Sequence, residues 1–249
     1  MKKIKALSVA AIGAASLAIG NQSAIAQLYD VQFVQPSQYT AMSGAAVLGS
    51  SSDNWNQYLV NWSYDNNPNP MTLANAAGNS AAGMQVGVWN YVGASYWASG
   101  NTTTADPASL MEDYIYSAPA ADGWPIKVQL SALPANASYQ LVVYAAGNGA
   151  GQGATISLAT DNTFSTILQS STTTGNDRDI TQGQGDAYQI LNGTTDGSGN
   201  IFFEVANTSQ YHALNGLQLE LTAVPEPSSM ALCFGGLMLL GLQRRPRSR

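Results

Sequence analysis

The chain is poor in the residues that most often carry chemistry. Its 249 residues include one cysteine, Cys233, and one histidine, His212. A single cysteine allows no disulfide within the chain, so its stability must come from packing. Zinc sites built from nitrogen and sulfur ligands lack candidates. His212 precedes the last strand pattern, where we expect an edge or turn position, and no Gly-x-Ser-x-Gly elbow is present. A hydrolytic triad and a zinc enzyme are therefore not expected.

Basic side chains are almost absent from the central part of the chain. Between residues 27 and 223, only Lys127 and Arg178 stand against fourteen acids, which gives a net charge of −12, compared with −6 for the whole chain. Nucleic acid is bound through clustered lysines and arginines, so this composition excludes it as a partner. It also argues against docking to anionic lipid. The acidity favours solubility outside the cell, and it is compatible with divalent cations or a polymer matrix.

The N-terminus reads as a secretory signal. A basic start, Met1-Lys2-Lys3-Ile4-Lys5, precedes an apolar run of small residues at 6–19. The run is short for a membrane span, and Ala24-Ile25-Ala26 has the small-x-small form that signal peptidase accepts. We expect residues 1–26 to be a signal peptide, with Ala24 and Ala26 forming the cleavage site.

The C-terminus has three parts that suit membrane residence. The motif Val224-Pro225-Glu226-Pro227-Ser228-Ser229 is followed by an uncharged apolar segment at 230–242. The two prolines keep the motif extended and accessible to an enzyme. The apolar segment predicts a transmembrane helix, although it is short for one. The positive-inside rule keeps the terminal arginines in the cytoplasm and places residues 27–223 outside; these are Arg244, Arg245, Arg247 and Arg249.

In these three parts the tail, residues 224–249, resembles the PEP-CTERM sorting signal. The core of the match is Val224, Pro225, Glu226 and Pro227, followed by the apolar segment and the arginine cluster. The resemblance implies recognition by an exosortase-type membrane enzyme, with cleavage near the motif. It also implies a Gram-negative host that makes exopolysaccharide. We accordingly expect an inner-membrane-anchored intermediate, and then a place at the cell surface or in the extracellular matrix.

The part between the two ends has the pattern of an all-β domain. Apolar residues alternate at 29–33, 84–88, 126–130, 201–205 and 217–221, and a more continuous apolar run covers 139–146. Period-two spacing predicts half-buried strands. Turn residues at 133–136 and 196–200 separate some of them. We therefore predict one β-sandwich or jelly-roll domain over 27–223, with long loops at 61–82, 98–109 and 170–186.

A second resemblance covers most of this domain. It rests on the segments 44–49, 53–56, 110–114, 133–144 and 213–219. In this order they are similar to galactose-binding-like jelly rolls of exported bacterial proteins. That family implies a β-sandwich that often binds sugars at its loops, but it supplies no residues that transfer to this sequence.

Tryptophan and tyrosine side chains occur beside amides and acids in a pattern that suits sugars. Sugar rings stack on flat aromatic side chains, while Asn and Asp bind their hydroxyls. The glycan-binding candidates are Trp55, Trp62, Tyr64, Trp97, Asp53 and Asn56. The alternative is that these tryptophans pack the core or anchor loops.

Several acids in one loop are candidate ligands for calcium. Asp177, Asp179 and Asp186 could supply the oxygen ligands of a structural calcium ion, although the spacing does not follow the EF-hand pattern. The alternative is a solvated acidic loop.

Taken together, the sequence predicts a non-catalytic exported protein that binds or scaffolds extracellular polysaccharide. A structural matrix protein without a small ligand is the first alternative. A secreted polysaccharide hydrolase or lyase is the second, and it would need two facing carboxylates in a cleft.

Overall fold

A computed structural model describes most of the central part of the chain. The described residues are 27–36, 39–60, 70–96, 105–106, 108–118, 124–147, 151–176, 178–207 and 211–222. They all belong to one compact unit, Ala26–Thr222. The predicted signal peptide and sorting tail lie outside them. Within these described ranges, no helix is long and apolar enough to cross a membrane.

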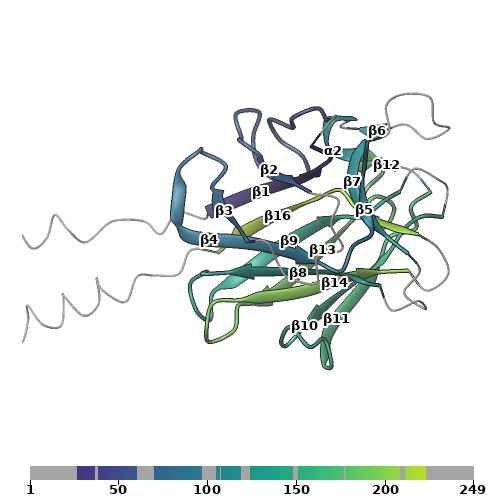
Figure 1. Cartoon of the computed structure of the whole chain (residues 1–249). Helices are drawn as coiled ribbons and strands as arrows, with labels where there is room; N and C mark the ends of the chain where they lie inside the picture. The colour runs from purple at the N-terminus through teal and green to yellow at the C-terminus, as the bar shows by residue number, and fades with distance from the viewer. Residues whose placement is uncertain are drawn as a thin grey trace, which may run out of the picture. The chain divides into compact units, whose positions relative to one another are not determined.

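Two sheets face each other (Figure 1). The five-stranded sheet runs in the order β13 (Tyr188–Thr194), β9 (Ser138–Tyr144), β16 (Gly216–Leu221), β1 (Gln27–Val34) and β2 (Asn56–Leu59). Its neighbours are antiparallel except β1 and β2, which are parallel. The six-stranded sheet runs β11 (Ile167–Thr172), β10 (Thr155–Ala159), β14 (Ile201–Ala206), β8 (Ile126–Ser131), β4 (Ser80–Trp89) and β3 (Met71–Ala74). All of its pairings are antiparallel.

The core lies between these sheets, and the alternating residues build it. In β8, Ile126, Val128 and Leu130 are buried while the residues between them are half-buried. Phe203 of β14 and Leu141 of β9 bring the two sheets into the same apolar cluster. The prediction of an all-β sandwich is confirmed, and hydrophobic burial of these inward rows holds it together.

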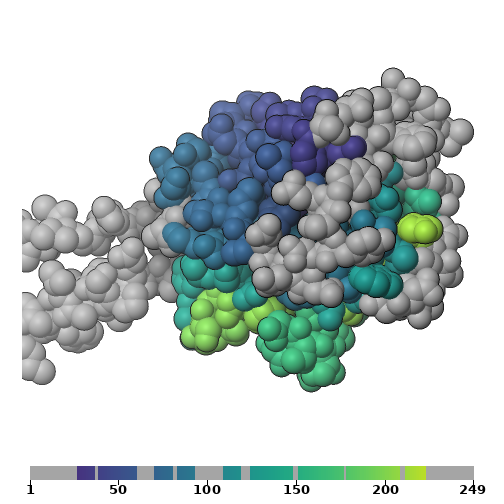
Figure 2. All heavy atoms as spheres, viewed as in Figure 1, coloured from purple at the N-terminus to yellow at the C-terminus, as the bar shows by residue number. Residues whose placement is uncertain are grey.

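Smaller elements gather at one end of the sandwich (Figure 1). A three-stranded sheet has the order β15 (His212–Leu214), β7 (Asp113–Ser117) and β5 (Gly93–Tyr96). A parallel pair joins β12 (Arg178–Asp179) to β6 (Ala105–Asp106). Two short helical turns, α2 (Ala108–Met111) and the 3₁₀ turn η2 (Ile180–Gln182), lie beside these strands in the sequence. The β10–β11 hairpin, in green, protrudes from the surface at the bottom of the view (Figure 2).

The loop predictions were partly wrong. The range 61–82 contains β3 and the start of β4, and 170–186 contains the end of β11, β12 and η2. The range 98–109 contains β6 and the start of α2. Of these strands, β3, β6 and β12 have two to four residues, and pairing with another strand fixes them. For example, β3 pairs with β4, with a register shift between Thr72 and Ala74. Local periodicity cannot reveal strands of two to four residues.

The outer face of the five-stranded sheet is not open to solvent, contrary to the half-buried pattern expected for β1. Residues 39–55, which we call the cover segment, lie over this face together with α2. Met42 and Trp55 from the cover segment and Leu110 from α2 form a second apolar cluster with Tyr144 of β9. Consequently the polar residues Asp30 and Gln32 of β1 are 0% exposed.

Candidate functional site

Trp55, the first predicted glycan ligand, is a packing residue. Its ring is 6% exposed, and its Nε1 donates to the backbone oxygen of Gly44 at 2.8 Å. The ring lies 6.4 Å from that of Tyr144 in the second apolar cluster. A sugar cannot stack on a ring enclosed in this way. Trp55 therefore has the core role that the sequence left open as the alternative.

Asp53 and Asn56 hold the backbone around Trp55. The Asp53 carboxylate accepts from the backbone N and the hydroxyl of Ser50, each at 2.7 Å, and so closes the turn before it. Asn56 Nδ2 donates to the backbone oxygens of Asp30 and Ala74, and its Oδ1 accepts from Ala74 N at 2.8 Å. This amide ties β1, β2 and β3 together. The polar atoms of both side chains therefore make hydrogen bonds that stabilise the fold.

The other predicted glycan residues, Trp62, Tyr64 and Trp97, lie outside the described residues, and so does Asp177. The remaining two calcium candidates each stabilise a turn. Asp179 accepts from Thr181 N and Oγ1, and Asp186 Oδ1 accepts from Thr174 Oγ1 and Asn176 N. Across the described ranges, no group of three or more His, Cys, Asp or Glu side chains is placed to hold a metal ion. Calcium at this loop stays a prediction of the sequence.

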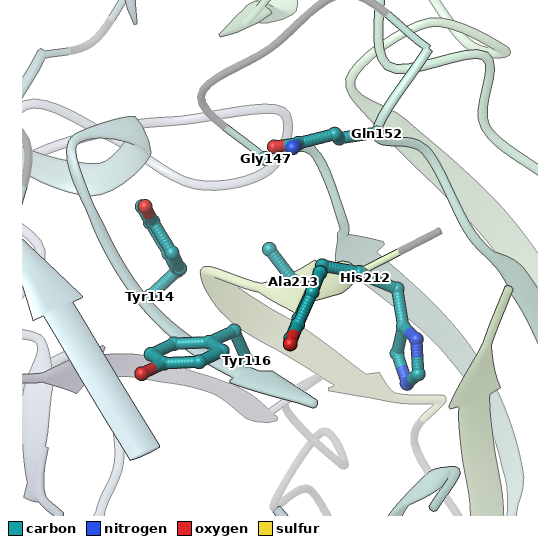
Figure 3. Close-up of a pocket in the computed structure, with 7 residues that line it drawn as sticks. Tyr114, Tyr116, Gly147, Gln152, His212 and Ala213 are labelled. Atoms are coloured by element: carbon teal, nitrogen blue, oxygen red, sulfur yellow. The ribbon is translucent and has the colours of Figure 1, made fainter. Parts of the chain in front are cut away.

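A different set of residues forms a shallow hollow at the end of the sandwich. It has a volume of about 200 Å³ and lies between β7, β15 and the strand-like bridge Ala146–Gly153. The residues that line it, which we call the tyrosine hollow, are Tyr114, Tyr116, Gly147, Gln152, Tyr211, His212 and Ala213. Figure 3 shows Tyr114 and Tyr116 on one side, with Gly147 and Gln152 across from them.

Three tyrosine rings form a stepped wall. Tyr114 and Tyr116 project to the same face because they are two residues apart on β7. Their ring centroids are 6.3 Å apart, and Tyr211 lies 6.3 Å from Tyr116, both pairs meeting edge to face. Tyr114 is 6% exposed whereas Tyr211 is 54% exposed. The wall thus runs from the interior to the surface and offers a large aromatic side chain to solvent.

The opposite wall depends on a glycine. Gly147 N donates to Gln152 O at 2.9 Å, which closes the loop that carries Gln152. A Cβ on Gly147 would lie 2.4 Å from Gln152 Oε1 and 2.7 Å from Gln152 Cβ. Only glycine leaves room for the amide in this position. Gln152 thereby brings a side-chain amide to the hollow.

His212 lies on β15, an edge strand of the three-stranded sheet, so its predicted edge position is correct. Its side chain is nevertheless 1% exposed. In Figure 3 the imidazole points away from Tyr114 and Tyr116. Its contribution to the hollow is therefore the backbone between Tyr211 and Ala213, not the ring.

The chemistry of the hollow is that of aromatic faces, phenol hydroxyls and an amide. None of the seven described residues that line it is an acid. Asp113 precedes Tyr114, but its carboxylate faces the other way, toward Gln32 and the backbone N of Thr40. Paired carboxylates, which glycoside hydrolysis requires, are not among these lining groups. The arrangement can stack against a ring and bind hydroxyl groups.

Sequence reasoning missed this site. The Tyr-Ile-Tyr alternation at 114–116 was the available signal, because it places two tyrosines on one face of a strand. Nothing local in the sequence brings Gln152 or Tyr211 to that face. Their approach depends on the pairing of β15 with β7 and on the bridge that joins Ala146 to Gly153.

Comparison with known proteins yields no family. No family model matches the chain, and no curated protein sequence matches it. Among solved structures, an isomalto-dextranase of Arthrobacter globiformis complexed with panose shares 13% identity over 60% of this chain, with a TM-score of 0.31. The match covers 22% of that enzyme, so this chain spans about a fifth of its length.

Two smaller proteins are matched at a similar level. A family 35 carbohydrate-binding module from Clostridium thermocellum is 14% identical over 54% of this chain and 90% of its own, with a TM-score of 0.30. The K1 cleaved adhesin domain of Lys-gingipain from Porphyromonas gingivalis is 13% identical over 57% and 84%, with a TM-score of 0.31. Scores this low carry no argument about what this chain does.

Proposed function

We propose that this chain is an exported surface or matrix protein that binds or scaffolds extracellular polysaccharide without cleaving it. The observation that carries the proposal is the tyrosine hollow on the β-sandwich. Sugar rings have apolar C–H faces that stack on aromatic rings, and Tyr211 offers such a ring at 54% exposure. The amide of Gln152 and the tyrosine hydroxyls match the hydroxyl groups of a sugar.

The shape of the site favours a polysaccharide chain as the ligand over a small free molecule. At about 200 Å³ and open on one side, the hollow is smaller than the pockets that enclose a drug-sized molecule. A polysaccharide needs only one or two rings to seat there while its remainder passes over the surface. The net charge of −12 between residues 27 and 223 favours a neutral or cation-bridged polymer over a strongly anionic one.

The direct test incubates the purified full-length protein, held in detergent, with the exopolysaccharide of its own host. Retention of the protein on the polymer and the release of new reducing ends are followed together. We expect retention without new ends. New reducing ends would show a hydrolase or lyase, and the absence of both signals would leave the structural matrix protein without a ligand.

We further propose that signal peptidase removes residues 1–26 and that an exosortase-type enzyme reads the tail. The support is the motif around Glu226, the short apolar segment and the terminal arginines. Glu226→Ala should keep the protein in the membrane fraction, because the motif would no longer be recognised. Glu220→Ala is the matched control, since that acid lies half-buried on β16. If Glu226→Ala leaves the membrane as fast as wild type, no processing enzyme reads the motif.

A further inference from the structure

Two aspartates lie sealed beneath the cover segment. Asp30 on β1 and Asp113 at the start of β7 are both 0% exposed. One oxygen of each carboxylate, Oδ2 of Asp30 and Oδ1 of Asp113, has no hydrogen-bond partner among the described residues. A buried carboxylate with an unpaired oxygen is costly when it is ionised, and far less so when a proton neutralises it.

Asp30 holds the far part of the cover segment through Gln218. Gln218 Nε2 donates to Asp30 Oδ1 at 2.8 Å and to the backbone oxygen of Leu48 at 3.1 Å. The same amide accepts, through Oε1, from Leu48 N at 2.9 Å and from the Tyr144 hydroxyl at 2.6 Å. Asp30 therefore orients the amide that clasps the backbone of Leu48 on both sides.

Asp113 holds residues 40–42, near the start of the cover segment, in the same way through Gln32. Asp113 Oδ2 accepts from Thr40 N at 3.4 Å and from Gln32 Nε2 at 3.3 Å. Gln32 Nε2 also donates to Thr40 O at 2.9 Å and to Ser109 O, and its Oε1 accepts from Met42 N at 2.9 Å. The cover segment is thus tied to the sheet at residues 40–42 and at 48 by two glutamine amides, each set by one aspartate.

The charged groups around Asp30 and Asp113 are mostly acidic. The charge of Asp53 on the cover segment acts on Asp30, and the charge of Glu112, the preceding residue, acts on Asp113; both raise the pKa of the aspartate. The cation packed nearby is Arg178 of β12, whose Nη1 donates to Met111 O at 3.3 Å. From the other packed elements, Asp179 and Asp186 serve turns beside β12 and β13, and Tyr144 and Tyr188 contribute phenols.

Burial is the main cause of the shifted pKa of both aspartates. It raises the pKa of Asp30 from 3.8 to about 7, opposed by the bond from Gln218 and aided by Asp53. It also raises the pKa of Asp113 from 3.8 to about 7, opposed by the backbone bond from Thr40 and aided by Glu112. A proton on each unpaired oxygen leaves every hydrogen bond described above in place.

We propose that Asp30 and Asp113 form a pH-operated lock, which holds the cover segment on the five-stranded sheet while both are protonated and loosens it when they ionise. The two glutamine clasps at Thr40–Met42 and Leu48 are the parts that open. Each ionised carboxylate adds its own desolvation cost, so ionisation of both aspartates disfavours the closed state more than ionisation of one. This lock is independent of polysaccharide binding.

Hydrogen exchange of the full-length protein tests the lock, with rates corrected for the chemical effect of pH. Between pH 5.5 and 8.0 we expect protection of amides in residues 39–48 to fall about tenfold or more, while β8 in the core keeps its protection. Asp30→Asn and Asp113→Asn are uncharged and of the same shape, and each should reduce this fall. Together they should abolish it. Asp161→Asn, at an exposed acid on the β10–β11 hairpin, is the control that should change nothing.

Equal protection of residues 39–48 at the two pH values would overturn the lock, and so would an undiminished fall in the double variant. Should the double variant fail to fold, carbon NMR titration of the wild-type carboxyl groups decides the matter. Two carboxyl groups titrating well above pH 6 support the lock. Midpoints near the ordinary value of about 4 for every aspartate contradict it.

Discussion

At the scale of a single residue, Trp55 allows a role in packing to be separated from a role in ligand binding. Its N–H bonds to Gly44 O, and its ring fills the second apolar cluster. Trp55→Phe should therefore lower the free energy of unfolding by about 1–3 kcal/mol, because Gly44 O loses its donor and the smaller ring leaves a gap. Urea unfolding measures this loss.

Retention on polysaccharide is the companion measurement for Trp55. The variant should bind as the wild type does, because the ring is enclosed. A variant with unchanged stability and lost retention would return Trp55 to the role of a sugar platform.

Among the elements, the turn between β13 and β14 shows why glycine is needed at one position and not at its neighbour. Asp196 Oδ1 accepts from Ser198 N at 2.8 Å and from Asn200 N at 2.7 Å. Gly199 has φ +75°, and a Cβ on it would lie 1.9 Å from Leu133 O. In the part of the chain that the structure describes, nothing lies within 4 Å of a Cβ on Gly197.

Alanine substitutions in this turn should differ accordingly. Gly199→Ala should cost about 2 kcal/mol or more, because it adds a clash with backbone to a left-handed conformation. Gly197→Ala should stay within about 0.5 kcal/mol of wild type. Thermal and urea unfolding of the pair give the comparison, and equal effects of the two substitutions would refute this account of the turn.

The elements that the sequence predicted are those whose pattern is local. The alternation at 126–130 and 201–205 became β8 and β14, and the turn residues at 196–200 form a turn. The cover over Asp30 and Gln32 could not be predicted, because an alternating strand looks the same whether water or another segment faces its polar side. Trp55 was ambiguous for a similar reason, since the same ring can stack on a sugar or fill a core. The tyrosine hollow depends on contacts between distant segments, which single-sequence patterns do not encode.

For the whole molecule, the two buried aspartates set the direction of the pH dependence. Their pKa in the folded chain, about 7, lies above the ordinary 3.8, so between about pH 4 and 7 the folded chain holds protons that the unfolded chain has released. The free energy of unfolding must then fall as pH rises through this window and level off above it.

Urea unfolding at pH 5 and pH 8 should show wild type less stable at pH 8 by up to about 5 kcal/mol, which is about 1.4 kcal/mol per pH unit for each of the two groups between pH 5 and their pKa of about 7. The double variant with Asn at 30 and 113 should lose most of that difference. The stability difference that remains in the double variant measures the general repulsion among the acids of the domain, which also lowers stability as pH rises. Wild type that is more stable at pH 8 than at pH 5 would contradict the assignment of raised pKa values to these two groups.

The proposed function requires that the tyrosine hollow binds polysaccharide. The most direct measurement is the affinity of Tyr211→Ala for the host exopolysaccharide, compared with wild type and with Tyr39→Ala, in which the tyrosine removed is 39% exposed and lies away from the hollow. We predict that Tyr211→Ala weakens binding about tenfold at unchanged stability, as expected for the loss of one stacking ring, and that Tyr39→Ala binds as wild type. Equal affinity of all three proteins would contradict it.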